Sequence, residues 1–106
     1  MPEISSENNY LTLINVFTVE QVNQQQLIDL LTLATESSVK NIKGFISASL
    51  HRSLDGTKVT MYAQWNSIED YQNMRNNPTA TPYLDQALKI ANFEPGMYEV
   101  VKIFLP

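Results

Sequence analysis

Residues 44–65 read GFISASLHRSLDGTKVTMYAQW, and the pairing within this stretch decides the fold. Two runs rich in β-branched and aromatic residues flank Asp55-Gly56, a dipeptide typical of a tight turn between antiparallel strands. A two-residue loop there pairs Leu54 with Thr57 and fixes the other pairs by counting back. One face then carries Ile46, Ala48 and Leu50 opposite Trp65, Ala63 and Met61, and the other carries Ser47, Ser49 and His51 opposite Gln64, Tyr62 and Thr60. A slip of one residue would mix these apolar and polar sets, so their separation supports the register.

Upstream of the hairpin, the sequence predicts one strand and one helix. Residues 10–18, YLTLINVFT, contain β-branched and aromatic side chains in alternation, as a strand does. Thr18 and Gln21 form a capping-box pattern, and apolar residues at helical spacing follow to about residue 40. Residues 1–9 offer nothing to bury, so we expect a flexible leader ahead of a single domain over residues 10–106.

Downstream of the hairpin, the pattern predicts two helices and a last strand. Ser67 and Asp70 cap a short helix through about residue 77, and Thr81-Pro82 opens another helix that ends near residue 92. Pro95-Gly96 then turns the chain into a strand over about 97–105. The order β-α-β-β-α-β predicts an α+β fold of the ferredoxin-like type, in which a four-stranded antiparallel sheet carries its helices on one face.

The composition disfavours several classes of function. Seven basic and eleven acidic residues give a net charge of −4, which disfavours a nucleic acid partner. The chain has no cysteine and one histidine, so we expect neither a metal site nor haem chemistry. It has no apolar run long enough to span a membrane, and its polar start, MPEISSENNY, lacks the pattern of a secretory signal. The sequence therefore predicts a cytoplasmic protein without a membrane partner.

One face of the predicted sheet carries no helix and could form a contact between two copies of the chain. A domain of 106 residues buries only part of its unfolded surface, and an uncovered sheet face would leave apolar area in water. Two such sheets that pack face to face would cover each other. The sequence therefore predicts a homodimer.

Two residues on the helix-covered side of the sheet are candidates for a ligand site. Trp65 offers a rigid apolar ring with one N–H donor, and Asn15 shares its strand face with Leu13 and Phe17. An apolar lining with a few polar groups is typical of sites for small molecules. The alternative is that Trp65 fills the core and that backbone groups satisfy the Asn15 amide. Sequence physics alone leaves both possibilities open.

The stretch GFISASLHRSLDGTKVTMYAQWNSIEDYQNM, residues 44–74, resembles the antibiotic biosynthesis monooxygenase family. The family pattern is a Gly-Phe strand, an HRS-x-DG hairpin and a strand that ends YAQW before a serine. The resemblance covers about residues 10–104. It implies a dimeric α/β barrel built from two ferredoxin-like units. It also implies that dioxygen oxygenates an electron-rich aromatic substrate without a metal, flavin or haem cofactor.

The resemblance carries over to individual residues only in part. Trp65 corresponds to the tryptophan that lines the family's cavity, and Tyr71 to a tyrosine six residues later in the quinone-forming members. Those members often have NYAQW, whereas this chain reads MYAQW and places Met61 where an amide is expected. Haem-degrading relatives have an asparagine in the first strand, and Asn15 matches it. They also have a histidine at the place where this chain has Met74-Arg75, so no imidazole is there to ligate iron. The resemblance therefore disfavours haem degradation.

The function predicted from this resemblance is that of a cofactor-independent monooxygenase acting on a small phenolic or polycyclic aromatic substrate. Trp65 would stack on the substrate ring, Asn15 would hydrogen-bond its oxygen, and Tyr71 would donate or shuttle a proton. His51 is expected on the polar sheet face, away from this site. The residues predicted to bind substrate around them are Leu13, Phe17, Met61, Ala63, Met74 and Arg75.

Two other functions remain open from the sequence. Met61 in place of the amide favours a non-catalytic dimeric barrel that binds a small apolar metabolite. The fold by itself also allows a different cofactor-free reaction, such as an isomerisation.

Overall fold

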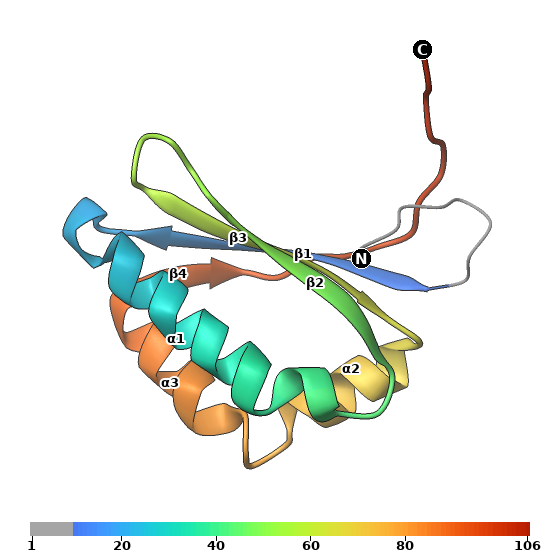
Figure 1. Cartoon of the computed structure of the whole chain (residues 1–106), viewed down its shortest axis with the longest axis horizontal. Helices are drawn as coiled ribbons and strands as arrows, with labels where there is room; N and C mark the ends of the chain where they lie inside the picture. The colour runs from blue at the N-terminus through green and yellow to red at the C-terminus, as the bar shows by residue number, and fades with distance from the viewer. Residues whose placement is uncertain (1–9) are drawn as a thin grey trace.

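An antiparallel sheet carries helices on one of its faces (Figure 1). The computed structural model describes residues 10–106, and the predicted leader, residues 1–9, lies outside the described residues. In chain order the elements are β1 (Leu11–Val19), η1 (Gln21–Asn23), α1 (Gln24–Ser37), η2 (Val39–Asn41), β2 (Phe45–Arg52), β3 (Lys58–Trp65), α2 (Ile68–Arg75), α3 (Thr81–Ile90), β4 (Ala91–Glu94) and β5 (Met97–Tyr98). The strand order is β2-β3-β1-β4, and β5 also pairs with β1. The predicted α+β, ferredoxin-like fold is confirmed.

The predicted register of the hairpin is confirmed over most of its length. The confirmed pairs are Ser47–Gln64, Ala48–Ala63, Ser49–Tyr62, Leu50–Met61 and His51–Thr60. The predicted pairing of Ile46 with Trp65 is wrong, because a bulge ahead of Ser47 places Phe45 opposite Trp65. A bulge inserts one extra residue into a strand, and here Ile46 is the extra residue and is 36% exposed.

The turn of the hairpin is wider than the predicted two-residue loop. It runs from Ser53 to Thr57, and only Gly56 takes a positive φ, of 81°. The backbone N–H groups of Thr57 and Lys58 donate to the Ser53 hydroxyl oxygen at 3.1 and 2.8 Å. These bonds close the longer loop, in which Asp55 has a negative φ.

The predicted start and end of the first helix are wrong. Thr18 still belongs to β1, and the chain passes through η1 before α1 begins at Gln24, with no side-chain cap at either start. The Gln21 amide donates to the Asp55 carbonyl at 2.8 Å, and the Gln24 amide donates to two carbonyls of the hairpin. These glutamines therefore hold the hairpin instead of capping the helix. The helix ends at Ser37, and η2 follows it.

The predicted starts of the two later helices are confirmed. The backbone N–H of Asp70 donates to the Ser67 hydroxyl oxygen at 3.1 Å and caps α2. Pro82 lies in the first turn of α3, where its missing N–H costs no helical hydrogen bond.

The predicted last strand over residues 97–105 is wrong for most of its length. β4 follows directly on α3 at Ala91, and β5 contains only Met97 and Tyr98. Tyr98 lies opposite Thr12, close to the beginning of β1 at Leu11, so the chain beyond Tyr98 has run past its pairing partner. Residues 99–106 belong to no helix or strand and lead away from the sheet (Figure 1).

The core between sheet and helices divides into two clusters of buried side chains. The Trp65 cluster comprises Leu13, Ala63, Trp65, Tyr71, Met74 and Ala80, and the hairpin-end cluster comprises Phe17, Val19, Leu27, Leu31, Val59 and Ala87. Within residues 10–106, none of the helices has both the length and the apolar character needed to cross a membrane.

Candidate active site

A hollow of about 90 Å³ lies between the sheet and the helices beside the Trp65 cluster. Its sheet wall comes from β1, β2, β3 and β4, and its helical wall from α1, η2, α2 and α3. All nine site residues predicted from the sequence line it: Leu13, Asn15, Phe17, Met61, Ala63, Trp65, Tyr71, Met74 and Arg75. The alternation of the two strands and the turn of α2 therefore bring the predicted set together.

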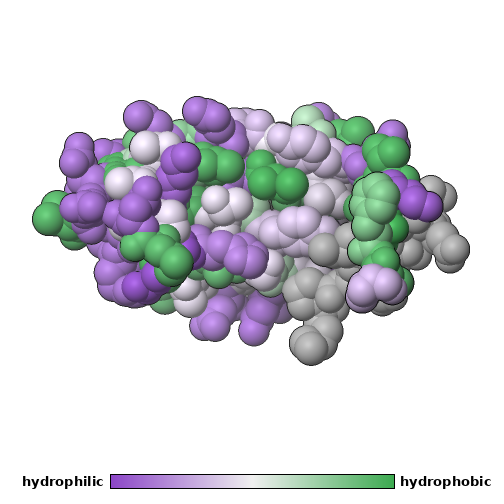
Figure 2. All heavy atoms as spheres, turned by 90° about the horizontal axis from the view of Figure 1, so that it is seen from above, coloured by the Kyte–Doolittle hydropathy of each residue, from purple (hydrophilic) through white to green (hydrophobic). Residues whose placement is uncertain are grey.

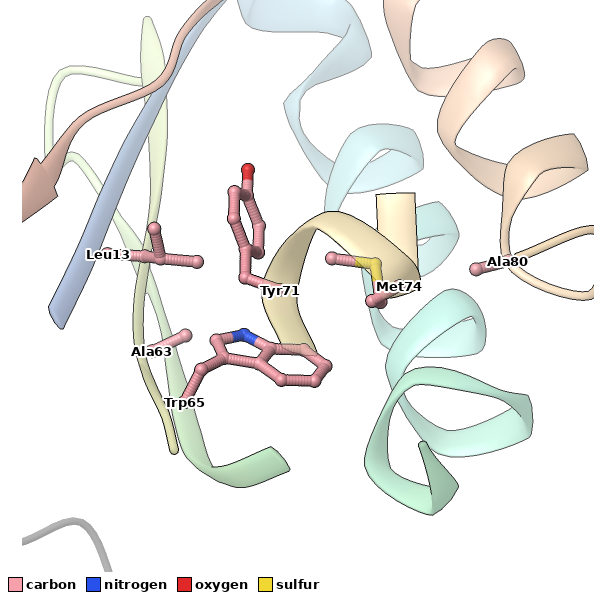
Figure 3. Close-up of a cluster of buried hydrophobic side chains, with 6 residues drawn as sticks. All are labelled: Leu13, Ala63, Trp65, Tyr71, Met74 and Ala80. Carbon is pink, nitrogen blue, oxygen red and sulfur yellow. The ribbon is translucent and has the colours of Figure 1, made fainter. Parts of the chain in front are cut away.

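Trp65 forms one wall of the hollow and is 1% exposed. Its ring packs edge-on against Phe45, with centroids 5.4 Å apart and planes at 81°. Tyr71 lies on the other side, with its ring centroid 6.2 Å from that of Trp65. The indole nitrogen faces Tyr71 (Figure 3), and among residues 10–106 no group accepts a hydrogen bond from it. The hollow therefore has a flat apolar wall with one free donor.

Asn15 brings an amide to the sheet wall from β1 and is half-buried. The backbone N–H of Gly96, in the turn between β4 and β5, donates to Asn15 Oδ1 at 3.4 Å. Asn15 lies directly opposite Met61 across the pairing of β1 with β3. Because its oxygen accepts from Gly96, the Asn15 amide keeps its Nδ2 group as a donor at the lining of the hollow.

Tyr71 and Arg75 form a pair at the edge of the hollow. The Arg75 guanidinium donates from Nη1 to the Tyr71 hydroxyl oxygen at 3.0 Å, and its central carbon lies 5.4 Å from the centroid of the Phe93 ring. Arg75 is exposed, whereas Tyr71 is buried. Since the Tyr71 oxygen accepts from Arg75, its own O–H is left to donate to a bound molecule. A cation and a hydroxyl therefore meet on the same side of the hollow.

His51 does not line the hollow. It is exposed, and its Nε2 lies 3.0 Å from the Ser49 hydroxyl, two residues along β2 on the polar face of the hairpin. The predicted placement of His51 away from the Trp65 site is therefore confirmed. Residues 10–106 contain no group of three or more His, Cys, Asp or Glu side chains arranged to hold a metal ion.

The sequence did not identify every residue of the lining. The others are Leu31, Ala34, Thr35, Val39, Phe45, Ala48, Leu84, Leu88 and Phe93. The helical spacing of Leu84 and Leu88 was a usable signal, since residues four apart share a helix face. Phe93 gave no such signal, because the pattern predicted the end of a helix and a turn where β4 lies.

The chain matches known proteins over most of its length. The family described as "Antibiotic biosynthesis monooxygenase" matches residues 10–85. Tetracenomycin-F1 monooxygenase of Streptomyces glaucescens is 36% identical over 104 residues, which cover 98% of this chain and 93% of that protein.

Solved structures share the fold. A monooxygenase of Streptomyces coelicolor, in complex with the ligand nanaomycin D, is 25% identical with a TM-score of 0.80, and the match covers 92% of each chain. A mutant of SnoaB, a cofactor-independent oxygenase of Streptomyces nogalater, is 18% identical with a TM-score of 0.79 over 92% of this chain and 98% of the other. The second likeness shows the fold alone. With a match to the family over more than half of its length and a relative that matches almost all of it, the chain belongs to the antibiotic biosynthesis monooxygenase family.

Proposed function

We propose that the protein is a cofactor-independent monooxygenase that oxidises a small electron-rich aromatic molecule, phenolic or polycyclic, with dioxygen. The observation that carries the proposal is the hollow beside Trp65, where an apolar wall meets three groups with a free N–H or O–H. The relatives support it, since one is named for its action on tetracenomycin F1 and another is described as a cofactor-independent oxygenase.

The donor character of the lining fits the electronic requirement of the reaction. Ground-state dioxygen is a triplet and reacts slowly with closed-shell molecules, so without a cofactor the substrate must supply the first electron. A deprotonated phenol or anthrone supplies it far more readily than the neutral molecule. Donors aimed at an oxyanion in a water-poor site stabilise that ionised form. The Trp65 indole, the Asn15 amide and the Tyr71 hydroxyl are such donors.

The proposed reaction balances without an added reductant. The ionised substrate passes one electron to dioxygen, giving a substrate radical and superoxide. These combine to form a carbon–oxygen bond, and a proton completes a hydroperoxide. Loss of water then leaves a carbonyl, so that one anthrone and one dioxygen give one anthraquinone and one water. A hollow walled by the sheet and the helices would hold the radical pair together until it recombines.

Each residue has a separate role in this proposal. Trp65 stacks on the substrate ring, and Asn15 donates to the substrate oxygen. Tyr71 donates or shuttles the proton, and Arg75 stabilises the negative charge beside it. Asn15 also supplies the amide that Met61 lacks at the family's asparagine position. Asn15 and Met61 lie opposite each other, so an amide on β1 reaches the same part of the sheet face as an amide on β3.

The hollow must widen before it can hold a substrate with fused rings. An apolar cavity of roughly 150 Å³ accommodates benzene, so a space of about 90 Å³ is too small for fused rings as it stands. Met61 and Met74 line it, and methionine has flexible, unbranched side chains that repack at low cost. We propose that these two side chains move aside when substrate enters.

The test is oxygen uptake by the full chain, purified with a chelator and mixed with anthrone in air. We expect uptake well above that of buffer, with one anthraquinone formed for each dioxygen consumed. Trp65→Phe and Asn15→Ala should each lower the rate by at least about tenfold, as loss of an oxyanion donor does in other enzymes. Val22→Ala, at an exposed site in η1, is the matched control and should leave the rate unchanged. Uptake no faster than in buffer would reject the proposal for this substrate class.

A second variant tests the amide itself. Asn15→Ala combined with Met61→Asn moves the amide across the β1–β3 pair to the position where many family members have it. We expect the double variant to recover a large part of the lost rate. If it does not, the amide is not acting as the donor assigned to it. Quenching of Trp65 fluorescence by anthrone without product would favour the non-catalytic binding function.

A further inference from the structure

A charged side chain stands out in the otherwise neutral lining of the hollow. The face of the molecule seen from above mixes hydrophilic and hydrophobic side chains (Figure 2), so a charge on that surface is ordinary. In the lining, by contrast, Arg75 is the only charged residue, and most of the others are apolar. A charge beside an apolar wall loses hydration, and this loss is offset when the charge gains a partner.

Arg75 lies where the hollow meets solvent. Among the lining residues only Arg75 and Leu88 are exposed, and Leu88 is 47% exposed. Arg75 comes from α2 and Leu88 from α3. We call the part of the lining around these two residues the mouth of the hollow. A molecule that enters the hollow therefore passes Arg75.

The Arg75 guanidinium has no acidic partner among residues 10–106. Its Nη1 donates to the Tyr71 hydroxyl oxygen at 3.0 Å, and no carboxylate of this part of the chain forms an ion pair with it. A guanidinium has further N–H donors on Nη2 and Nε, and it remains charged at any physiological pH. These donors and the positive charge are therefore available to a bound molecule.

Contacts with two elements orient the guanidinium. Its central carbon lies 5.4 Å from the centroid of the Phe93 ring on β4 and 6.0 Å from that of the Tyr71 ring on α2. A cation in the last turn of a helix is favoured by the helix dipole, but the dipole does not require contact with a ring of a distant strand. A group that is already oriented loses less freedom when it binds a ligand.

The distances allow one molecule to contact both Trp65 and Arg75. The ring centroids of Trp65 and Tyr71 are 6.2 Å apart, and the central carbon of Arg75 is a further 6.0 Å from the Tyr71 centroid. A molecule of two or three fused rings can therefore lie against Trp65 and present a substituent to Arg75.

We propose that the aromatic substrate carries a carboxylate, and that Arg75 binds this group at the mouth and selects such substrates over neutral ones. This inference rests on the proposed function, since it names the substrate class of the same site. A guanidinium and a carboxylate are both planar and form two parallel N–H···O bonds. Nη2 and Nε would form them, while Nη1 keeps its bond to Tyr71. The net charge of −4 gives no general attraction for anions, so the preference would come from Arg75.

The first test compares two ligands with the same rings, 2-naphthoate and its neutral amide, 2-naphthamide. Neither contains a phenol, so calorimetric titration of the full chain measures binding without reaction. We expect the carboxylate to bind at least about tenfold more tightly, as hydrogen bonds between charged groups allow. Arg75→Gln should remove this preference and leave the affinity for the amide unchanged. Arg75→Lys keeps the charge but not the planar fork, so it should retain part of the preference.

Arg52→Gln is the matched control. Arg52 is also exposed and also donates to a neutral group, Gln25 Oε1 at 2.7 Å, but it lies outside the lining. This variant should keep the preference of the parent. Equal affinity of the parent for the two ligands, or a preference that survives Arg75→Gln, overturns the proposal. Failure of both ligands to bind overturns it as well, because the hollow would then not accept aromatic molecules.

The second test separates this inference from the proposed function. Oxygen uptake is measured with anthrone and with anthrone-2-carboxylate, for the parent and for Arg75→Gln. Weaker stabilisation of the ionised ring slows both substrates and divides out in the ratio of their kcat/KM values. We expect the ratio of the carboxylate to the neutral substrate to fall at least about tenfold in the variant, chiefly through KM. Oxidation of both substrates with an unchanged ratio overturns carboxylate recognition and leaves the proposed function standing. A binding preference without any oxidation rejects the proposed function and leaves carboxylate recognition standing.

Discussion

The two ends of the space between sheet and helices share the same strands but are packed differently. At the hairpin end, Leu27, Val59 and Ala87 are fully buried and none of them lines the hollow, which touches this cluster only at Phe17 and Leu31. At the Trp65 end, a hollow of about 90 Å³ remains beside the rings of Trp65 and Tyr71. The same sheet therefore supports a solid core at one end and a partly empty one at the other.

Side-chain size explains the difference. At the hairpin end, branched aliphatic side chains from sheet and helices interdigitate, as they do in ordinary cores. At the Trp65 end, Ala48 and Ala63 lie opposite each other across β2 and β3, beneath large flat rings. Two methyl groups cannot fill the volume that the rings hold open. The comparison indicates that the hairpin end is closely packed, whereas the Trp65 end leaves the space that we propose as the substrate site.

The largest expected effect follows from removing a side chain at the solid end. Leu27 is 0% exposed, so Leu27→Ala should lower the free energy of unfolding by about 2–5 kcal/mol through lost burial and a new cavity. Met61→Ala should cost less than about 2 kcal/mol, because Met61 is only half-buried and already borders a hollow. Urea unfolding followed by circular dichroism measures both. Equal losses at the two sites would remove the distinction between the ends.

A smaller effect follows from adding the same side chain at both ends. Ala87→Leu overfills the solid end and should cost about 1–3 kcal/mol of unfolding free energy. Ala48→Leu enters the hollow and should change the unfolding free energy by less than about 1 kcal/mol, while weakening anthrone binding at least about tenfold. Urea unfolding and quenching of Trp65 fluorescence are the two measurements. Tight binding by Ala48→Leu would mean that ligands do not use this hollow.

The sequence predicted most of the sheet, and its errors have a common physical cause. Alternation alone fixed the register from Ser47 to His51, because a slip would have exchanged the two faces. The bulge at Ile46 was not visible in the alternation; Gly44, two residues before it, has a φ of 90° and lies against the Asp70 side chain, a contact between residues far apart in the chain. The last strand was overextended because residues 99–105 have strand composition, whereas pairing requires a neighbour that one chain does not provide.

The candidate site was more predictable than the chain ends. Strand parity placed Leu13, Asn15 and Phe17 on one face, and one helical turn related Tyr71 to Arg75. The engagement of Asn15 by Gly96 was beyond sequence reasoning, since these residues are far apart in the chain and meet only when β4 and β5 pair with β1. Local periodicity finds which residues face inward, but the orientation of a polar group depends on such distant contacts.

The smallest expected effect concerns the loop that closes the solid end. Hydrogen bonds from the side chain and backbone of Thr57, and then from Ser53, lower the pKa of Asp55 from 3.8 to about 2. A carboxylate with a depressed pKa stabilises the folded chain above its ordinary pKa, and this contribution is lost as the pH falls from about 3.8 through about 2. We therefore expect Asp55→Asn to be slightly less stable than the parent near pH 6, with the difference shrinking between pH 4 and 2.

Because Asp55 lies at the hairpin and not at the hollow, anthrone binding near neutral pH should be the same in both proteins. A change in binding would mean that the loop and the hollow are coupled, and the two ends could then no longer be treated as separate.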